Sequence, residues 1–317
     1  MLKSPILSTT DWIEKLSSKR NIAVGGKLLA MYSSYVGGIT TDVVHMNIPL
    51  DDHMVHRGHG VYDSGCILHG NIVDGPSHVE RLIQSAKDAG IPCKWSKDQI
   101  LSITNDVVAS NRCRNGSYRI FVSSGPGSFG IHSYHCEEPS LYVIVYTTSD
   151  LFLKPATPVS EVTVSTDEIP MKPPSLAHIK SVNYLSNVML ADIALQRGGF
   201  VGIWVDPFGN VKEGSIASIS IVTNDGVFVT PPFDDILKGC TVQRLASIAQ
   251  ANNLVQAAEV RNVTKDELYG AAEVIISCGD INVYPVVKID GRPIGSGSVG
   301  PVCRELVGYL NLEATGV

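Results

Sequence analysis

The sequence has no apolar run long enough to cross a membrane. A spanning helix needs about 18 or more consecutive apolar residues, whereas a typical apolar stretch, residues 141–146, has the length of a strand. A strong charge bias is also missing, because 25 Lys and Arg oppose 31 Asp and Glu without a long basic block. These absences argue against a membrane protein and against nucleic acid or an anionic membrane as the main partner.

The seven cysteines include no C-x-x-C pair, and their number is odd. Free thiols in a reducing compartment are therefore expected. The first 20 residues lack the apolar stretch of a signal peptide, and Asp11 and Glu14 are uncommon in a transit peptide. We predict a cytoplasmic protein. A form processed from a longer organellar precursor stays open as the alternative.

The composition predicts a folded chain of about two domains, with 44% hydrophobic and 18% charged residues. Strands and helices alternate without regular βαβ units, which favours an α/β (α+β) class with two mixed domains. The proline-containing segment 149–160 is interpreted as a linker. The predicted division is an N-terminal extension (1–26), a small domain (27–148), the linker (149–160) and a larger domain (161–317).

Three capping boxes predict helix starts, at Ser77–Glu80, Ser96–Gln99 and Thr264–Glu267. Apolar periodicity predicts two more helices, over 182–196 and 241–251. Strands are expected over 118–123, 141–146, 162–164, 201–205, 219–223, 227–230, 274–277 and 283–289.

Two local motifs suggest sites that their surroundings do not favour. Residues 125–130 match G-x-G-x-x-G, but a dinucleotide site needs a helix directly after the loop, and the residues that follow do not predict one. The histidines at 53, 56 and 59 lie beside Asp51 and Asp52, yet no carboxylate or thiol follows at metal-site spacing. A polar loop is the simpler interpretation, and we predict no metal site.

Lys180 lies in a mostly apolar stretch at the predicted start of the 182–196 helix. Burial together with the positive end of the helix dipole would favour a neutral amine, which Schiff-base chemistry requires. Taken alone, an exposed lysine at a helix end is the simpler interpretation.

Other parts of the chain supply groups that could bind the same ligand as this lysine. Glu213 follows the turn 206–210, and residues 237–241 form a Gly-led helix start with a hydroxyl, which suits a phosphate. Arg81 could add a charge-assisted phosphate contact. An amine, a carboxylate for a ring nitrogen and phosphate ligands together indicate a pyridoxal 5'-phosphate site.

In this order the motifs resemble those of the fold-type IV pyridoxal phosphate enzymes, the family of branched-chain and D-amino acid aminotransferases and aminodeoxychorismate lyase. The resemblance runs from about residue 32 to 306, and within the family the chain looks most like the plant-type D-amino acid aminotransferases. Its landmarks are the segments 58–63, 78–82, 180–185, 213–214, 237–241 and 283–286, with 33–40, 51–60 and 171–174 pointing to the plant type.

The resemblance implies a small N-terminal and a larger C-terminal α/β domain, with the cofactor in the cleft between them, and a homodimer. It also implies a ping-pong transfer of an amino group from an amino acid to a 2-oxo acid. Lys180 would form the Schiff base and carry the proton, and Glu213 would face the pyridine nitrogen. The other implied site residues are Arg81, Thr241, the N–H of Cys240 and Gly279 for the phosphate, Tyr184 for the cofactor oxygen, and Tyr62 on the substrate side.

The chain departs from the family pattern in three respects. Ser218 replaces an asparagine, Gly279 replaces a hydroxyl residue, and Phe129 and Ile131 stand where bacterial D-amino acid enzymes carry Arg and His for the substrate carboxylate. The best substrate prediction is a D-amino acid such as D-alanine or D-aspartate, with 2-oxoglutarate or pyruvate as acceptor. A branched-chain L-amino acid aminotransferase, aminodeoxychorismate lyase and a pyridoxal phosphate-binding protein without catalysis are the alternatives.

Overall fold

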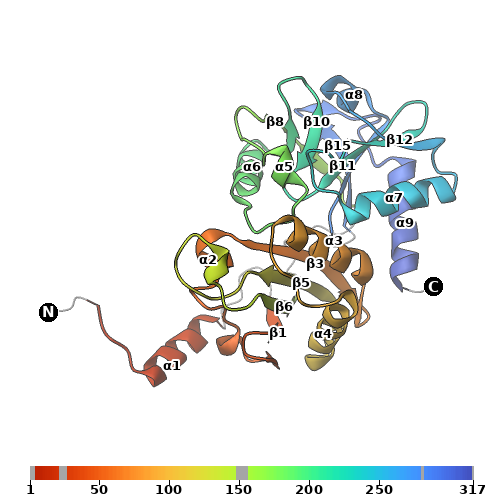
Figure 1. Ribbon diagram of the computed structural model, residues 1–317. Coiled ribbons are helices and arrows are strands. Elements are labelled where there is room, and N and C mark those ends of the chain that lie inside the picture. The colour runs from red at the N-terminus through yellow and green to blue at the C-terminus, as the bar shows by residue number, and fades with distance from the viewer. Residues whose placement is uncertain (1–3, 21–26, 148–155, 280–281, 316–317) are drawn as a thin grey trace. The chain divides into compact units, whose positions relative to one another are not determined.

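The computed structural model describes residues 4–20, 27–147, 156–279 and 282–315, shown in Figure 1. The chain forms two compact units, Met1–Phe152 and Leu153–Val317. Helices and strands are mixed in each unit, as the sequence predicts. The boundary falls inside the predicted linker 149–160. Because residues 148–155 lie outside the described part, the limits of that linker stay a prediction.

Unit 1 is built on a six-stranded sheet in the order β2-β1-β6-β5-β3-β4. All its neighbouring strands are antiparallel. The strands are β1 (Leu28–Ser33), β2 (Gly38–Thr40), β3 (Gly60–Leu68), β4 (Asn71–Ile72), β5 (Gly116–Ser123) and β6 (Ser140–Tyr146). The strands predicted over 118–123 and 141–146 are confirmed as β5 and β6.

Two helices, α3 (Gly75–Asp88) and α4 (Lys97–Ser110), pack on this sheet. The capping box at Ser96 is confirmed, since its side chain and that of Gln99 both bond to the opposite backbone N–H. The box predicted at Ser77 is wrong. The helix begins earlier, after Asp74, because a proline with a helix-compatible φ occupies its first turn.

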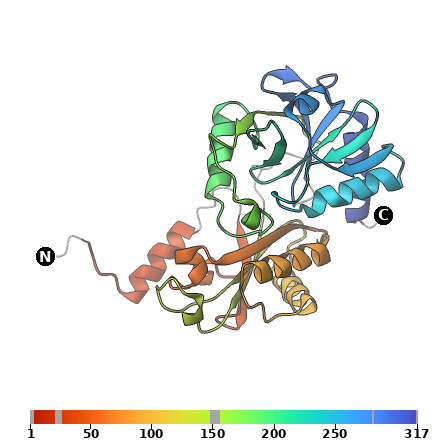
Figure 2. The same ribbon diagram turned by 45° about the horizontal axis from the view of Figure 1, so that its top comes forward.

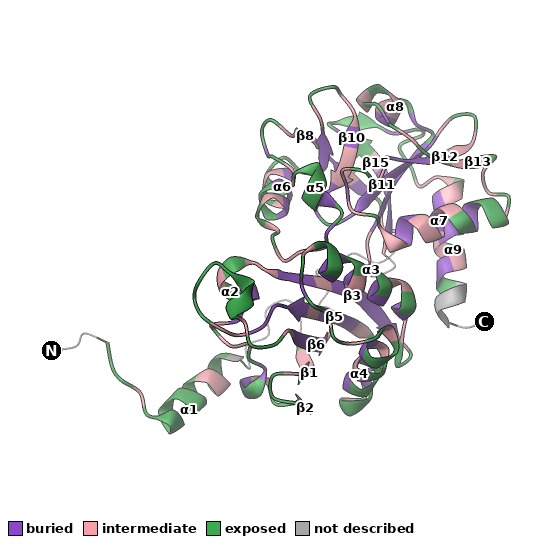
Figure 3. Ribbon diagram, in the orientation of Figure 1, coloured by how far each residue is buried: buried purple, intermediate pink, exposed green. Residues whose placement is uncertain are grey.

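The sheet has a mostly buried face and a partly exposed face, and in Figure 3 buried and intermediate residues both occur along its strands. In β5, Tyr118, Ile120 and Val122 are fully buried, whereas Arg119 and Phe121 alternate with them and are partly exposed. The ring of Tyr118 contacts that of His78 in α3, so the buried face is the one that α3 covers. The period of two in the sequence thus sets which side chains remain available on the other face.

Unit 1 also contains α1 (Thr9–Arg20), η1 (Val43–His45), α2 (His53–Arg57) and η2 (Ser133–His135). Sequence reasoning missed α1, whose apolar residues Trp12 and Ile13 are exposed instead of forming a core-facing stripe. No α-helix follows the glycine loop 125–130, as predicted. Gly125 has φ +93°, and a Cβ there would lie 1.7 Å from the carbonyl oxygen of Glu138, so the glycine permits a close backbone approach.

Unit 2 combines two sheets. The three-stranded sheet has the order β10-β9-β8, and the seven-stranded sheet has the order β13-β12-β11-β14-β15-β16 with β7 paired to β15. The strands are β7 (Val159–Glu161), β8 (Thr163–Ser165), β9 (Ile203–Val205), β10 (Val211–Gly214), β11 (Ser218–Val222), β12 (Val227–Thr230), β13 (Ala257–Val260), β14 (Glu273–Ser277), β15 (Val283–Ile289) and β16 (Arg292–Pro293). The helices are α5 (Pro174–Ala177), α6 (Leu185–Gln196), α7 (Cys240–Ala251), α8 (Lys265–Gly270) and α9 (Pro301–Thr315).

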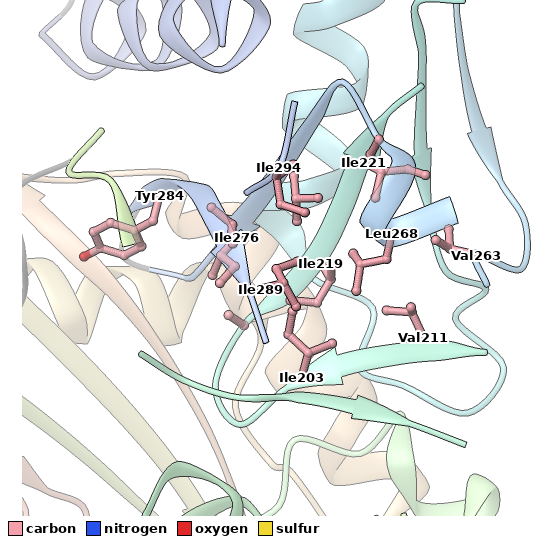
Figure 4. Close-up of a cluster of buried hydrophobic side chains, with 14 of the residues drawn as sticks. Ile203, Val211, Ile219, Ile221, Val263, Leu268, Ile276, Tyr284, Ile289 and Ile294 are labelled. Atoms are coloured by element: carbon pink, nitrogen blue, oxygen red, sulfur yellow. The ribbon is translucent and has the colours of Figure 1, made fainter. Parts of the chain in front are cut away.

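The core of unit 2 forms on both faces of the larger sheet. Figure 4 shows one cluster, in which Ile203 and Val211 of the smaller sheet meet residues such as Ile219 and Ile276 of the larger one. On the other face, α7 and α9 bury apolar side chains, and both helices lie beside the sheet in Figures 1 and 2. The strands β11, β12, β14 and β15 therefore contribute apolar residues to two layers, which explains their nearly continuous apolar sequences.

Several predicted elements are confirmed with the same bounds or with shifted ends. The strands over 227–230 and 283–289 match β12 and β15, and the Thr264 capping box begins α8. The strand predicted over 162–164 is confirmed as β8 with its bounds shifted by one residue, and Val162 lies between β7 and β8, which belong to different sheets. α9 was missed. Among the described residues, no helix is both long and apolar enough to span a bilayer.

Candidate functional site

Lys180 lies in the turn between α5 and α6 and is 9% exposed. The expectation that it begins a helix is wrong, because α6 begins only at Leu185 and Tyr184 is its N-cap residue. The helix-dipole argument therefore loses its basis, whereas burial remains. The Lys180 Nζ donates to the Tyr184 hydroxyl oxygen over 3.3 Å. This contact orients the amine through the side chain predicted to reach the cofactor.

Glu213 lies in β10 and accepts a hydrogen bond from the backbone N–H of Leu237, at 3.2 Å from its Oε2. Burial raises the pKa of Glu213 to about 7, although this hydrogen bond and the charges of Lys172 and Lys180 oppose the rise. The carboxylate is thus poorly neutralised by the protein itself. A positively charged ring nitrogen placed beside it would supply the missing partner.

Lys172 is a member of this cluster that sequence reasoning missed as a functional residue. Its Nζ lies 4.4 Å from the centre of the Tyr184 ring. Burial lowers the pKa of Lys172 to about 8; Glu213 opposes the change and Lys180 adds to it. The sequence contained a signal, because this lysine stands among prolines ahead of Lys180, but only the fold shows that it approaches Tyr184.

The N-terminus of α7 has no side-chain cap. Gly239 is its N-cap residue, and a Cβ there would lie 2.4 Å from the Ser218 hydroxyl oxygen. The first N–H groups of a helix carry partial positive charge and need acceptors, so this end suits an anion such as phosphate. The Thr241 hydroxyl donates to the Cys278 carbonyl over 2.8 Å, which ties α7 to the end of β14.

Four buried polar atoms around these elements have no hydrogen-bond partner in the described structure. They are Asn187 Oδ1, Ser215 Oγ, Ser220 Oγ and Ser277 Oγ. Ser215 follows β10 directly, and Ser277 pairs with Ser218 in the sheet. Unsatisfied buried polar groups are costly. Their concentration around Glu213 and the start of α7 therefore fits a polar ligand with a ring nitrogen and a phosphate.

Gly279 follows β14, next to residues 280–281, which lie outside the described part. Its predicted phosphate contact stays a prediction, and so does that of Cys240, the first residue of α7. Asp280, the acidic residue noted beside Gly279 in the sequence, falls on an undescribed position.

Arg81, predicted to contact the phosphate, forms a buried ion pair within unit 1. Its Nε donates to Asp63 Oδ2 over 2.7 Å, and its Nη2 donates to Asp63 Oδ1 over 2.8 Å. His78 Nδ1 lies 2.8 Å from Asp63 Oδ1. Burial alone would raise the pKa of Asp63, but Arg81 and His78 outweigh it and hold that pKa well below its usual range. The guanidinium is thus fixed in one orientation.

Tyr62, predicted to lie on the substrate side, occupies β3 on the partly exposed face of the sheet of unit 1. Its ring lies beside that of Phe121, with centroids 6.0 Å apart, and the guanidinium carbon of Arg119 lies 5.1 Å from the Tyr62 ring centre. Sequence reasoning missed Arg119, although an arginine inside an apolar strand was the available signal. This face of unit 1 therefore presents aromatic rings and a cation.

The histidines of the 51–60 segment interact with one another. The Nδ1 atoms of His53 and His59 lie 3.1 Å apart, and the Ser124 hydroxyl is 2.9 Å from His59 Nδ1. Burial, followed by the charges of His59 and His56, lowers the pKa of His53. In the described part of the chain, no group of three or more His, Cys, Asp or Glu residues is arranged to hold a metal ion.

The structure thus brings Lys180, Tyr184 and Glu213 together in unit 2, with Gly239 linked to them through the Leu237 segment. Arg81 and Tyr62 belong to unit 1. The contribution of both units to one site stays a prediction.

Comparisons with known proteins agree on one family. Residues 60–289 match the family model described as amino-transferase class IV. The D-amino-acid transaminase, chloroplastic, of Arabidopsis thaliana is 38% identical over 310 residues, which cover 96% of this chain and 81% of that protein. The D-alanine aminotransferase of Bacillus licheniformis is 28% identical over 260 residues, 82% of this chain and 89% of that protein.

A solved structure supports the same fold. The crystal structure of the Escherichia coli branched-chain amino acid aminotransferase aligns with a TM-score of 0.80, over 90% of this chain and 95% of that chain. The sequence identity is 21%, so this likeness concerns the fold alone. The two-unit mixed architecture is therefore one that this enzyme shares.

Proposed function

Given that the chain belongs to the class IV aminotransferase family, we propose that it transfers an amino group from a D-amino acid to a 2-oxo acid with pyridoxal 5'-phosphate bound at Lys180. The observation that carries the cofactor assignment is the cluster of Lys180, Tyr184 and Glu213 in one unit. The uncapped N-terminus of α7, linked to it through Leu237, supports the assignment as a phosphate site.

Pyridoxal phosphate supplies an aldehyde that condenses with amines and a ring that withdraws electrons from the substrate Cα. Lys180 would provide the amine that holds this aldehyde, and its Nζ would accept and return the proton of the substrate Cα. Tyr184 holds the Lys180 amine in position. Glu213 stabilises a proton on the ring nitrogen. The N–H groups of Cys240 and Thr241 bind the phosphate, with Arg81 and Gly279 as the further proposed contacts.

The D-amino acid preference rests on relatives. The Arabidopsis thaliana protein is named a D-amino-acid transaminase, and the Bacillus licheniformis protein a D-alanine aminotransferase. D-Alanine or D-aspartate as donor, with 2-oxoglutarate or pyruvate as acceptor, is the proposed reaction. Tyr62 lines the substrate side in this proposal. The structural likeness to a branched-chain enzyme reports the fold alone, but a Methanocaldococcus jannaschii relative, 29% identical, is named a putative branched-chain-amino-acid aminotransferase, so that reaction is the competing proposal.

The visible absorption spectrum of the purified protein tests both parts of the proposal. A yellow protein whose band is bleached by D-alanine, and not by L-leucine, is the expected result. Bleaching by L-leucine alone would replace the D-amino acid assignment with the branched-chain reaction. A yellow protein that is indifferent to both points to lyase chemistry or to binding without catalysis, and release of pyruvate from aminodeoxychorismate separates these two.

Lys180→Ala tests the cofactor assignment, and Lys265→Ala is its matched control. Because both the amine that binds the aldehyde and the proton carrier are removed, we expect turnover to fall by at least about 10³-fold. Lys265→Ala, which removes another lysine of unit 2, should leave turnover unchanged. Near wild-type turnover in Lys180→Ala would show that the cofactor is not bound through this residue.

We further propose a homodimer. α6 exposes four large apolar side chains, Leu185, Val188, Met189 and Leu195. Successive members lie three, one and six residues apart in the sequence, and such a patch is unusual on an isolated chain. Sedimentation should give the mass of a dimer for the wild type and of a monomer for Val188→Asp combined with Leu195→Asp. A monomeric wild type would contradict the proposal.

A cytoplasmic location is the accompanying proposal. No disulfide links any of the seven cysteines, all of which lie in the described residues. The Arabidopsis thaliana relative is named as chloroplastic, so an organelle is the competing compartment. Fractionation of the source cells, with an antibody against this chain, distinguishes the two locations.

A further inference from the structure

A second amine lies in the Lys180 cluster. The Nζ of Lys172 lies 4.4 Å from the centre of the Tyr184 ring, and that of Lys180 lies 5.7 Å from the same centre. The Lys180 amine also reaches the hydroxyl of that tyrosine. One aromatic side chain is thus contacted by two lysines. A cation placed over an aromatic ring is attracted by the negative face of the ring, so Tyr184 can hold the Lys172 charge in place.

Lys172 differs from an ordinary structural lysine in the charged groups that surround its amine. Lys212, beside Glu213, illustrates the ordinary case, because its amine pairs with Asp235 at 2.6 Å and with Asp206 at 3.2 Å. Lys172 has no ion pair among the described residues. The charged groups that act on it are Glu213, which attracts it, and Lys180, which repels it.

This position gives the Lys172 charge two effects on its neighbours. Charge interactions are reciprocal, so a cation that is attracted by Glu213 also favours the ionised form of that carboxylate. The same cation opposes a second positive charge on the nearby nitrogen of Lys180. Lys180 also favours the ionised form of Glu213, whereas Asp235 acts in the opposite direction.

We infer that Lys172 is a positioning residue of the amino-transfer site, whose charge, held over Tyr184, favours the ionised form of the Glu213 carboxylate and repels a positive charge on the Lys180 nitrogen. The inference rests on the proposed function, because it assigns Lys172 to the same site. In this role, the charge of Lys172 affects the site, whereas the shape of its side chain does not. A structural lysine would act through its packing.

Burial is consistent with this role. It lowers the pKa of Lys172 to about 8, so the amine is mainly charged below that pH and mainly neutral above it. The influence of Lys172 on the site should therefore fade as the pH rises through about 8.

The test compares Lys172→Met and Lys172→Arg in the holoenzyme. The measurement is the pH at which the visible absorption band of the bound cofactor changes. In Lys172→Met we expect this pH to rise by about one unit, because a repelling charge is lost, with kcat at pH 7 about tenfold lower and KM little changed. Lys172→Arg keeps the charge and should restore the wild-type transition. Lys265→Met removes another lysine that lies over a tyrosine, Tyr269, and should shift nothing.

A second measurement uses the protein without cofactor. Reductive methylation by formaldehyde and cyanoborohydride modifies neutral amines, and mass spectrometry reports the rate at Lys180. This rate at pH 7 should fall about tenfold in Lys172→Met and recover in Lys172→Arg. Lys172→Gln provides a polar substitute if the methionine variant fails to fold.

The outcomes separate the two proposals. A wild-type protein that cannot bind the cofactor would contradict the proposed function, while the methylation rates would still decide the role of Lys172. An unchanged cofactor transition together with an unchanged Lys180 methylation rate in Lys172→Met would overturn the inference. So would an arginine variant that behaves like the methionine variant.

Discussion

Asp63 of unit 1 and Glu213 of unit 2 are carboxylates placed in opposite surroundings. Asp63 is fully buried, and Arg81 and His78 both reach it at hydrogen-bond distance. Glu213 accepts a backbone hydrogen bond, and the charges of Lys172 and Lys180 act on it. The pKa of Asp63 is therefore held well below its usual range, whereas burial raises that of Glu213 to about 7.

The difference indicates two uses of a buried charge. The protein completes the charge balance of Asp63 itself, so this group contributes to the stability and orientation of Arg81. The charge balance of Glu213 is incomplete, and such groups cluster at functional sites because a ligand completes them. Changes at Asp63 should therefore act mainly on stability, and changes at Glu213 mainly on the reaction.

Asp63→Asn should have the largest effect. Removing one partner of a buried ion pair leaves Arg81 without its counter-charge, and we expect the free energy of unfolding to fall by about 3 kcal/mol. Urea unfolding followed by circular dichroism measures this loss. Glu80→Gln, which breaks an exposed pair between Glu80 of α3 and Lys97 of α4, is the matched control. Equal losses in the two variants would remove the distinction between the pairs.

Glu213→Gln should slow the reaction of the holoenzyme with its amino acid. A neutral amide no longer stabilises a proton on the ring nitrogen, and we expect a loss of about 10²-fold. Rapid mixing with D-alanine, followed by visible absorption, gives the rate. A variant that reacts at the wild-type rate while retaining its cofactor would show that Glu213 does not face the ring.

The pH dependence of stability should follow the carboxylates with raised pKa. Burial also raises the pKa of Glu161 to about 7, against hydrogen bonds from the N–H groups of residues 200–202. A raised pKa means that the folded protein binds the proton more tightly, so this stabilisation is complete below about pH 4.5 and is lost as pH rises toward 7. Tm should therefore decrease between pH 5 and 7.5, and less steeply in Glu161→Gln.

Asp63 provides an opposite test, because its pKa is lowered in the folded protein, whereas the pKa values of Glu161 and Glu213 are raised. Its stabilisation is present above its ordinary pKa and is lost only as the pH falls toward the acidic range. Asp63→Asn should therefore lower Tm by a similar amount at pH 5 and at pH 7.5. A strongly pH-dependent loss over this range would show that the Asp63 charge is not fixed by Arg81.

The smallest effect is expected for Lys97→Met. Lys97 pairs with Glu80 on an exposed surface, and such pairs contribute about 0.5 kcal/mol or less. Urea unfolding at low and at high salt checks this value. A loss comparable to that of Asp63→Asn would mean that burial does not separate the two kinds of pair.

The sequence predicted local features well where neighbouring residues decide them. The capping boxes at Ser96 and Thr264 and the strands that became β12 and β15 were correct. The box at Ser77 failed because Pro76 and Asp74 offered an earlier start to the same helix. α1 was missed because its apolar side chains face solvent and leave no periodic signal.

The candidate site was predictable as a set of residues and less so as an arrangement. Lys180, Glu213 and the Gly239 segment were selected by motif order, and the family was correctly identified from it. The Lys180 contact with Tyr184 arises from the turn before α6, which replaced the helix start expected at that place. The sequence indicated Lys172 only as part of a family motif. Its approach to Tyr184 depends on how the proline-rich segment folds back, which the motif does not specify.

The sequence by itself determined the family, the mixed fold class and the residue types available for amino transfer, because these depend on the order of short motifs and on local periodicity. The tertiary structure decided which charges are matched. Asp63 acquires Arg81 and His78 from α3, whereas Glu213 meets Leu237, Lys172 and Lys180 from separate segments of unit 2. Electrostatic energy depends on distance and burial, and neither is written in the spacing of residues along the chain.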